Sequence, residues 1–407
     1  MFRYNYHPLK NKERSTLIFL ILFSALIRVP VILTLGDAGL EHEWKAIMES
    51  LTKHGVFSSK NFDGFLIPNL FMPPLYAFYL YFFSLINLEG QSYVQLILSS
   101  QILLSSISVA VFYKINKIFF SEKISFFSSL IFSIFPLHVY ACSQISSVSL
   151  QSFLTILFFY LFFQFIKKRN FLSIFSFSLT GGLLILLRGE FIAIFILSLS
   201  YLLFFLKIEI KKIFLVGLIT FIIILPYLTR NILIFETVTI TKSVGWNLWK
   251  GNNPYSTVEG SPRVYGNLAE QIKNIPKNRF YEINSDKIFL DEAFKNINNE
   301  PVRYLILFFK KVLSFMFIDI KSTQPNYYNP WHYLPVLFLG ITSTLGIIVS
   351  NKKSHQLNYL ILYFFLNIII FSTFFILPRY KLAIIPIQII FTNVLFNYVI
   401  NKFFKSK

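Results

Sequence analysis

The stretch from residue 147 to residue 169, SVSLQSFLTILFFYLFFQFIKKR, decides the fold class of this chain. Its first 20 residues carry no charge and are mostly apolar, and Lys167, Lys168 and Arg169 follow at once. A helix needs about 20 apolar residues to cross the hydrocarbon core of a bilayer. The stretch therefore predicts a transmembrane helix that ends in a basic cluster.

Similar apolar runs recur from Leu17 to Ile400, and 55% of the 407 residues are hydrophobic. A soluble protein of this length could not cover so much apolar surface. We therefore expect one polytopic, all-α integral membrane domain over residues 1–407, built as a bundle of about ten transmembrane helices. The expected spans are 15–36, 93–113, 124–141, 147–166, 171–187, 190–206, 213–229, 333–350, 357–376 and 380–401.

The net charge of +19 is concentrated between the apolar runs. The basic clusters are Lys114, Lys117 and Lys123; Lys167, Lys168 and Arg169; Lys207, Lys211 and Lys212; Lys352 and Lys353; and Lys402, Lys405 and Lys407. Short loops rich in Lys and Arg face the cytoplasm. This pattern predicts a multi-pass protein of the inner (plasma) membrane with both termini cytoplasmic, and it explains the charge without a nucleic acid partner.

Two connections on the opposite, outer face are long, over residues 37–92 and 230–332, and we expect each to carry helices at the membrane surface. Within them, the apolar segments 66–86 and 302–320 cannot both cross as ordinary spans if both termini are cytoplasmic. The first opens with prolines, which disfavour a helix start, and the second mixes basic and apolar residues as an interfacial helix does. The alternative is a bundle of twelve spans.

The first outer loop begins with three acids, Asp37, Glu41 and Glu43, ahead of an amphipathic helical pattern. One interpretation is that they stabilise the start of that helix. The other is that one of them is a general base at the membrane boundary, where partial desolvation raises the pKa of a carboxyl group.

Three arginines lie at predicted outer ends of spans: Arg188 in LLRGEF, Arg230 in LPYLTRNILIF and Arg379 in LPRYKL. Arginine near hydrocarbon is costly unless it is paired or faces a cavity, and its planar fork fits phosphate oxygens. The three predict an anionic headgroup or phosphate site, with snorkelling to the lipid headgroups as the alternative.

In the second loop, SVGWNLWKGNNPYS combines Trp246 with Asn252 and Asn253. Aromatic faces beside amides fit sugar rings, although an aromatic belt at the interface has the same composition. Cys142 is the only cysteine, and P-loop, Rossmann, nucleophile-elbow and HExxH patterns do not occur. We expect no cofactor, with a divalent metal left open.

The order of these features resembles the polytopic C-type (GT-C) glycosyltransferases, in particular the protein O-mannosyltransferase and lipid A aminoarabinose transferase group and its RgtA/B/C/D-like relatives. The segments that carry the resemblance are IMESLTKHGVFSS, MPPLYAFYLYFF, LLRGEF, LPYLTRNILIF, GWNLWKGNNP, DEAFKNINNEPVRYLILFFKK and LPRYKLAIIP.

The resemblance implies inverting transfer of a sugar from a polyprenyl-phosphate donor, outside the cytoplasm, in cell-envelope glycan biosynthesis. The acceptor would be a glycan, a lipid or a protein, and membrane lipids would surround the enzyme. Carried over by position, Glu41 and Glu43 are the best candidates for the base. Arg379 and Arg230 would contact phosphate, and Arg188 is a weaker candidate for donor binding.

Two positions depart from the family pattern. Leu40 stands where many relatives have the first acid of an Asp-Glu pair, which puts the position of the base in doubt. Ser149 lies where relatives often place a second acid after the third span. If that acid is essential, the chain is impaired or uses a different acceptor.

Two other functional classes fit a membrane bundle. A transporter or flippase of a lipid-linked saccharide would place ionisable residues near the bilayer midplane and show two related halves. A non-catalytic assembly protein would tolerate loss of the first-loop acids. The candidate residues here gather at helix ends, which favours the enzyme.

The topology can be tested with reporters attached after Ser121 and after Asn253. Because the basic clusters alternate with uncharged connections, we expect the two reporters to lie on opposite sides of the membrane. Protease protection of each fusion measures this. Protection from the same side would contradict the assignment of outer loops.

Overall fold

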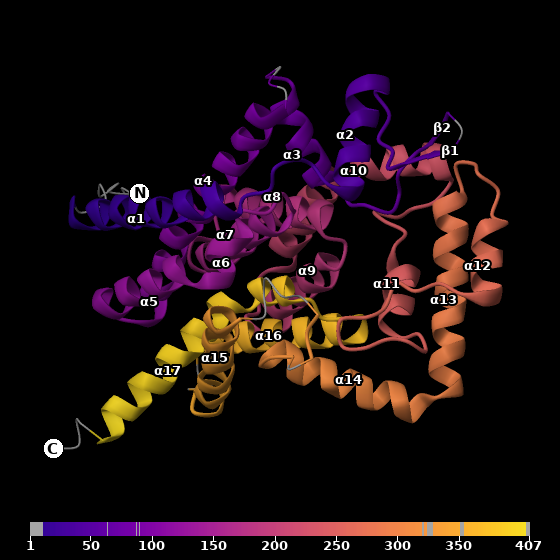
Figure 1. The fold of residues 1–407 in the computed structure, drawn as a ribbon. Helices are drawn as coiled ribbons and strands as arrows, with labels where there is room; N and C mark the ends of the chain where they lie inside the picture. The colour runs from indigo at the N-terminus through magenta and orange to yellow at the C-terminus, as the bar shows by residue number, and fades with distance from the viewer. Residues whose placement is uncertain are drawn as a thin grey trace.

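The computed structural model describes residues 11–62, 64–86, 88, 90–319, 321–323, 329–350 and 354–403 of the protein. These residues form a helical bundle with a smaller group of helices at one end (Figure 1). The start of α1 (Asn11–Leu35) and the end of α17 (Ile385–Phe403) lie at the opposite end of the bundle (Figure 1). Both described ends of the chain therefore lie at the same end of the bundle (Figure 1).

Each expected span coincides with a helix or with two consecutive helices. They are α1, α4 (Gly90–Phe119), α5 and α6 (Glu122–Ile134, Pro136–Ala141), α7 (Val148–Lys168), α8 (Phe171–Leu187), α9 and η1 (Phe191–Ser200, Tyr201–Phe205), α10 (Ile210–Phe235), α15 (Pro330–Ile348), α16 (His355–Thr373), and η2 and α17 (Pro378–Ala383, Ile385–Phe403). Within the described residues, six of these helices, α1, α4, α7, α10, α15 and α16, are each long and apolar enough to cross a membrane. The predicted all-α membrane fold is confirmed.

The span expected at 124–141 is broken into α5 and α6 at Phe135 and Pro136. Proline has no N–H for the helical ladder, and it pushes the preceding residue out of the helical region. Phe135 accordingly has extended backbone, with φ −63° and ψ 119°. The break frees carbonyl groups at the end of α5.

The two apolar segments that were expected not to cross are α3 (Pro74–Ser84) and α14 (Pro301–Met316). The 11 residues of α3 make a helix of roughly 16 Å, too short for a bilayer of about 30 Å. On α14, Val302, Leu305, Phe309 and Leu313 form an exposed apolar stripe. Both helices agree with the prediction of interfacial elements.

The two long connections that were expected on the outer face contain helices and contact each other. The first contains α2 (His42–His54) and a small antiparallel hairpin, β1 (Lys60–Phe62) and β2 (Phe65–Ile67), which the sequence did not predict. The second contains α11 (Val244–Gly251), α12 (Gly266–Lys273) and α13 (Tyr281–Asn299).

Glu282 of α13 joins the two loops. Its carboxylate accepts hydrogen bonds from the Lys60 ammonium at 2.8 Å and from the backbone N–H groups of Leu70 and Phe71 at 2.5 and 2.7 Å. The side chain is buried, so these bonds are shielded from water. They fix the segment that leads into α3.

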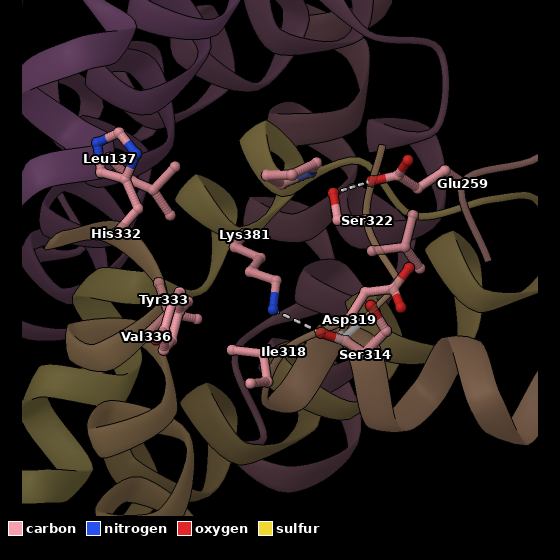
Figure 2. A pocket seen from close by; sticks show the side chains of 12 residues that line it. Leu137, Glu259, Ser314, Ile318, Asp319, Ser322, His332, Tyr333, Val336 and Lys381 are labelled. Carbon is pink, nitrogen blue, oxygen red and sulfur yellow. Dashed lines mark hydrogen bonds between the residues drawn. The ribbon is translucent and has the colours of Figure 1, made fainter. Parts of the chain in front are cut away.

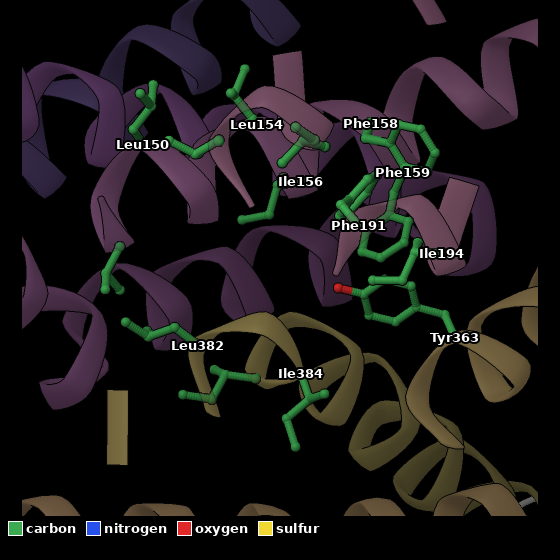
Figure 3. Close-up of a cluster of buried hydrophobic side chains, with 14 of the residues drawn as sticks. Leu150, Leu154, Ile156, Phe158, Phe159, Phe191, Ile194, Tyr363, Leu382 and Ile384 are labelled. Atoms are coloured by element: carbon green, nitrogen blue, oxygen red, sulfur yellow. The ribbon is translucent and has the colours of Figure 1, made fainter. Parts of the chain in front are cut away.

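Aromatic residues of α7, α9 and α16 form the centre of the hydrophobic core (Figure 3). Phe158 meets Phe191 edge to face with ring centroids 5.0 Å apart, and Phe159 meets Tyr363 in the same way at 4.6 Å. Leu382 and Ile384 are buried in the same cluster (Figure 3). The core therefore anchors η2, the short helix that carries Arg379.

A buried polar network crosses this core at Arg28 of α1, whose exposed fraction is 0%. Its guanidinium donates to the Ser133 carbonyl at 3.0 Å, to the Ser105 hydroxyl at 2.8 Å and to Nδ1 of His138 at 2.8 Å. Since an arginine can only donate, Nδ1 accepts and the imidazole carries its proton on Nε2. Arg28 thus caps the carbonyl end of broken α5 and holds α6 beside α1 and α4.

Replacing Arg28 with leucine is expected to destabilise the fold. The Ser133 carbonyl and the His138 ring would each lose a buried donor, a loss of roughly 2 kcal/mol or more. Thermal unfolding of the detergent-solubilised protein measures the effect, with Arg263→Leu at an exposed position as the control. Equal unfolding temperatures for both variants would show that the cap contributes nothing.

Candidate functional site

Three basic side chains gather around two aromatic rings where α8, α11 and η2 meet. The guanidinium carbons of Arg188 and Arg379 lie 5.6 and 5.7 Å from the centre of the Tyr380 ring. The Lys250 ammonium lies 4.3 Å from the centre of the Phe375 ring, and the two rings are 5.9 Å apart. We call Arg188, Lys250 and Arg379 the cation cluster. Such contacts are favourable when the cations are partly desolvated.

Arg188 is compensated within the protein. It caps α8, and its Nε lies 3.0 Å from the Gln151 amide oxygen and 3.3 Å from the Glu190 carboxylate. Within the described part of the chain, Lys250 and Arg379 form no ion pair. Neighbouring cations that form no ion pair attract anions.

Glu43, at the start of α2 in the first long connection, acts electrostatically on this cluster. Burial lowers the pKa of Lys250, the nearby Arg379 guanidinium lowers it further, and the Glu43 carboxylate acts in the opposite direction. Glu43 and Arg379, far apart in the sequence, therefore act on the same ammonium group. Interactions of this kind fall off over about 10 Å in salt solution.

The motif KGNNP fixes Lys250 by packing backbone against backbone. A Cβ at Gly251 would lie 1.8 Å from the Phe374 carbonyl oxygen, so only glycine permits this approach. The Asn252 amide donates to the Leu248 and Thr373 carbonyls, both at 2.9 Å. The end of α11 is thereby joined to the end of α16.

The amide of Asn253 is also engaged by the protein. It donates to the Trp249 and Ser261 carbonyls at 3.1 and 2.8 Å, and its oxygen accepts from the Tyr255 N–H. Asn252 and Asn253, which the sequence analysis proposed as sugar ligands, are both buried and hold a turn. Trp246, the third such candidate, packs on Trp249 and remains partly exposed.

Asp37 is the most enclosed of the three first-loop acids. Its carboxylate accepts from the Ile145 N–H at 2.6 Å, and its own N–H donates to the Ser143 carbonyl at 3.0 Å. Burial raises the pKa of Asp37, the Ile145 hydrogen bond opposes this, and the Glu41 carboxylate raises it further. Glu41 and Glu43 lie at the start of α2 and are exposed.

A cavity of about 690 Å³ opens beside Asp37. Apolar residues of α1, α5 and α6 form much of its wall, and Gln144, Asn329 and His332 add polar groups. A half-buried carboxylate beside a cavity with apolar and polar walls is a favourable position for a base.

Arg230, expected to contact phosphate beside Arg379, has a different set of neighbours. Its guanidinium donates to the Asn69 carbonyl and to the Asn231 amide oxygen, each at 2.8 Å. Phe57 and Phe235 place their rings 5.7 and 5.1 Å from it. These contacts join α10 to the first loop, and they include no member of the cation cluster.

A smaller pocket of about 30 Å³ lies under η2 (Figure 2). Lys381 donates there to the Ser314 carbonyl at 2.5 Å and to the Phe317 carbonyl, which caps the end of α14. Glu259 accepts from Ser322, so its carboxylate is also engaged (Figure 2). Among the described residues, no group of three or more His, Cys, Asp and Glu is arranged to hold a metal ion.

The sequence had not singled out Lys250, Phe375 or Tyr380. Lys250 and Tyr380 stand inside two quoted motifs, GWNLWKGNNP and LPRYKLAIIP. A lysine directly before the glycine of a tight turn, and an aromatic directly after Arg379, were the available signals. Neither signal shows that Lys250 lies close to Arg379 and Tyr380, because that follows only from the contact between α11 and α16.

Comparison with known proteins gives a match to one family model and to several solved structures. Residues 72–229 match the dolichyl-phosphate-mannose-protein mannosyltransferase family. The oligosaccharyltransferase AglB of Archaeoglobus fulgidus, in complex with an inhibitory peptide and a dolichol-phosphate, is 13% identical, with a TM-score of 0.57 over 97% of this chain and 51% of its own. The apo form of the A. fulgidus oligosaccharyltransferase has 13% identity and a TM-score of 0.56, over 98% of this chain and 51% of its own. ArnT of Cupriavidus metallidurans bound to undecaprenyl phosphate has 11% identity and a TM-score of 0.46, over 94% and 76%.

The chain spans about half the length of the archaeal oligosaccharyltransferase, at 51%. None of the curated proteins compared with the chain matches it. At this low identity the structural likeness establishes a shared fold, and function must be argued from the site. The resemblance to C-type glycosyltransferases predicted from the sequence is confirmed.

Proposed function

We propose that this chain, which has the fold of the C-type glycosyltransferases, transfers a sugar from a polyprenyl-phosphate donor to an acceptor hydroxyl. The observation that carries the proposal is the pair Lys250 and Arg379, which form no ion pair among the described residues and lie against the Phe375 and Tyr380 rings. The Glu43 carboxylate of the first loop opposes the lowering of the Lys250 pKa. The reaction would take place at the outer face, with both termini of the chain in the cytoplasm and the protein in the inner membrane.

In this proposal, Lys250 and Arg379 bind the phosphate of the donor. Arginine offers parallel N–H donors to phosphate oxygens, and lysine adds a mobile point charge. As the bond between the sugar carbon and the phosphate oxygen breaks, the electron pair stays on the phosphate, and the two cations stabilise the growing charge. Tyr380 and Phe375 keep them in place without neutralising them.

A first-loop acid would take the proton of the acceptor hydroxyl. The acceptor oxygen then attacks the sugar carbon from the face opposite the phosphate, which inverts the configuration. Of Asp37, Glu41 and Glu43, we assign the base to Asp37 because it alone is half enclosed beside a cavity. Glu43 is the alternative, since it acts on Lys250.

The comparisons support the kind of substrate. AglB, whose fold this chain shares, has been captured with a dolichol-phosphate and a peptide. The family matched over residues 72–229 is named for a dolichyl-phosphate-mannose donor and a protein acceptor. For this chain we propose a polyprenyl-phosphate-linked sugar as donor and a glycan, lipid or protein as acceptor.

The transporter hypothesis expects an ionisable residue facing a path through the membrane. Arg28 is such a residue by position, but its guanidinium is hydrogen bonded to Ser24, Ser105, Ser133 and His138. A fully buried side chain with this many hydrogen bonds supports a structural role for Arg28. Movement of a fluorescent lipid-linked sugar across vesicles containing only this chain, without sugar transfer, would favour the transporter.

Removing either phosphate ligand is expected to weaken use of the donor. For Lys250→Ala and Arg379→Ala, the loss of a charged hydrogen bond should raise the donor KM about tenfold to a hundredfold. Initial rates in micelles with a synthetic polyprenyl-phosphate sugar measure this. Arg230→Ala is the matched comparison and should leave the donor KM near the wild-type value, because its contacts lie in the first loop. The reverse pattern would transfer the phosphate site to Arg230.

The base assignment predicts a particular pH dependence. The carboxylate must be ionised, so the rate should fall as the pH drops through the raised pKa of Asp37, above the ordinary value of about 3.9. Glu41→Gln removes a charge that raises this pKa, so the acidic limb should move to lower pH. Asp37→Asn should reduce kcat by about a hundredfold or more at every pH.

Profiles of kcat/KM between pH 4 and pH 9, as the working range, for Asp37→Asn, Glu41→Gln and Glu43→Gln decide between the acids. Full activity of Asp37→Asn, together with loss in Glu43→Gln, would move the base to Glu43.

A further inference from the structure

Lys311 of α14 is a charged side chain with an exposed fraction of 0%. Its ammonium donates to the Gly251 carbonyl at 2.8 Å, the Asn252 amide oxygen at 3.1 Å and the Phe374 carbonyl at 2.6 Å. No carboxylate forms an ion pair with it among the described residues. Burying an unpaired charge is costly, so a purely apolar residue would serve packing better.

The three oxygens that Lys311 holds belong to the residues directly behind the proposed phosphate site. Gly251 follows Lys250 in the chain, and Phe374 precedes Phe375, whose ring lies against the Lys250 ammonium. The close approach of Gly251 to the Phe374 carbonyl occurs at the same point. Lys311 therefore sits at the junction that sets how far α11 lies from the turn before Arg379.

We propose that Lys311 is a positioning residue of the phosphate site, which holds the ends of α11 and α16 together and so sets the spacing of Lys250 and Arg379. The inference rests on the proposed function. Lys311 cannot itself be a ligand of the donor, because it is fully buried and its donors are engaged. It acts through Lys250.

The number of acceptors indicates the working form of Lys311. An ammonium has three N–H donors, and three oxygens surround it. Burial lowers the pKa of Lys311 to about 7, but the neutral amine would leave one of these oxygens without a donor. The charged form is the one that the surroundings fit.

Without the ammonium, carbonyl dipoles from two helix ends would point at one another across an empty space. Their repulsion would separate α11 from the α16 turn, and water would be drawn between them. The contact of Lys250 with the Phe375 ring would then loosen. The donor phosphate would meet two separated cations in place of an adjacent pair.

The test is direct binding of polyprenyl phosphate without sugar, titrated into the purified full-length protein in detergent micelles. Lys311→Met should weaken binding about tenfold, as expected for loss of one well-placed charged contact. Lys310→Met, at the exposed neighbouring position on the same helix, should bind as the wild type does. Asn252→Leu removes the same junction from the other side and should match Lys311→Met, which keeps the test valid if one variant does not fold.

A double-mutant cycle separates positioning from a general structural effect. If Lys311 acts through Lys250, adding Lys311→Met to Lys250→Ala should change affinity by less than about twofold. If the losses of affinity in the two single variants multiply in the double variant, the inference is overturned. Wild-type binding by Lys311→Met or Asn252→Leu would also overturn it. If the variants contradict the role of Lys311 but the wild-type protein binds polyprenyl phosphate, the proposed function stands. If the wild-type protein does not bind polyprenyl phosphate, the proposed function and this inference fall together.

Discussion

A backbone carbonyl that leaves a helix inside or beside a bilayer must find a donor within the protein, because lipid offers none. In this chain, buried basic side chains are donors at several such places. Arg28 caps the end of α5, Lys311 caps the ends of α11 and α16, and Lys381 caps the end of α14. The carbonyl groups that the irregular backbone frees at these places are therefore hydrogen bonded within the protein.

The same constraint separates structural cations from those available to a ligand. Arg28, Lys311 and Lys381 are buried with carbonyl partners, and Arg230 also donates to a carbonyl. Lys250 and Arg379 contact aromatic rings, which attract a cation but do not neutralise it. Neither of the two forms an ion pair among the described residues, and an anionic ligand is the partner that we propose for them. The distinction depends on what each charge contacts and not on how deeply it is buried.

The sequence predicted the membrane fold well because hydrophobic length and charge alternation are properties of single segments. It also led to the prediction that α3 and α14 do not both cross the membrane, because two cytoplasmic termini require an even number of spans. The break at Pro136 was visible as a proline, but its consequence needed the Arg28 contact to the Ser133 carbonyl. The hairpin of β1 and β2 is too short for any alternating pattern to show.

The site was less predictable because one residue type can either hold the fold together or bind a ligand. Arg230 and Arg379 both stand at the outer end of an apolar run, and only their neighbours distinguish them. Asn252 and Asn253 have the amide chemistry of a sugar ligand, but their hydrogen bonds are used to close a turn. Contacts between segments far apart in sequence decide these cases.

The arrangement of acids and bases also suits the chemistry that we propose. A base and a leaving phosphate need surroundings of opposite charge. A nearby cation lowers the pKa of a carboxyl group, and a nearby carboxylate raises it. Among the causes that set the pKa of Asp37, burial comes first and Glu41 is the charged group that acts on it, whereas Lys250 is acted on by Arg379 and Glu43. The helix α2 therefore carries one acid toward each partner. In the reaction that we propose, the start of this short amphipathic helix thus contributes negative charge beside both the base and the phosphate ligands.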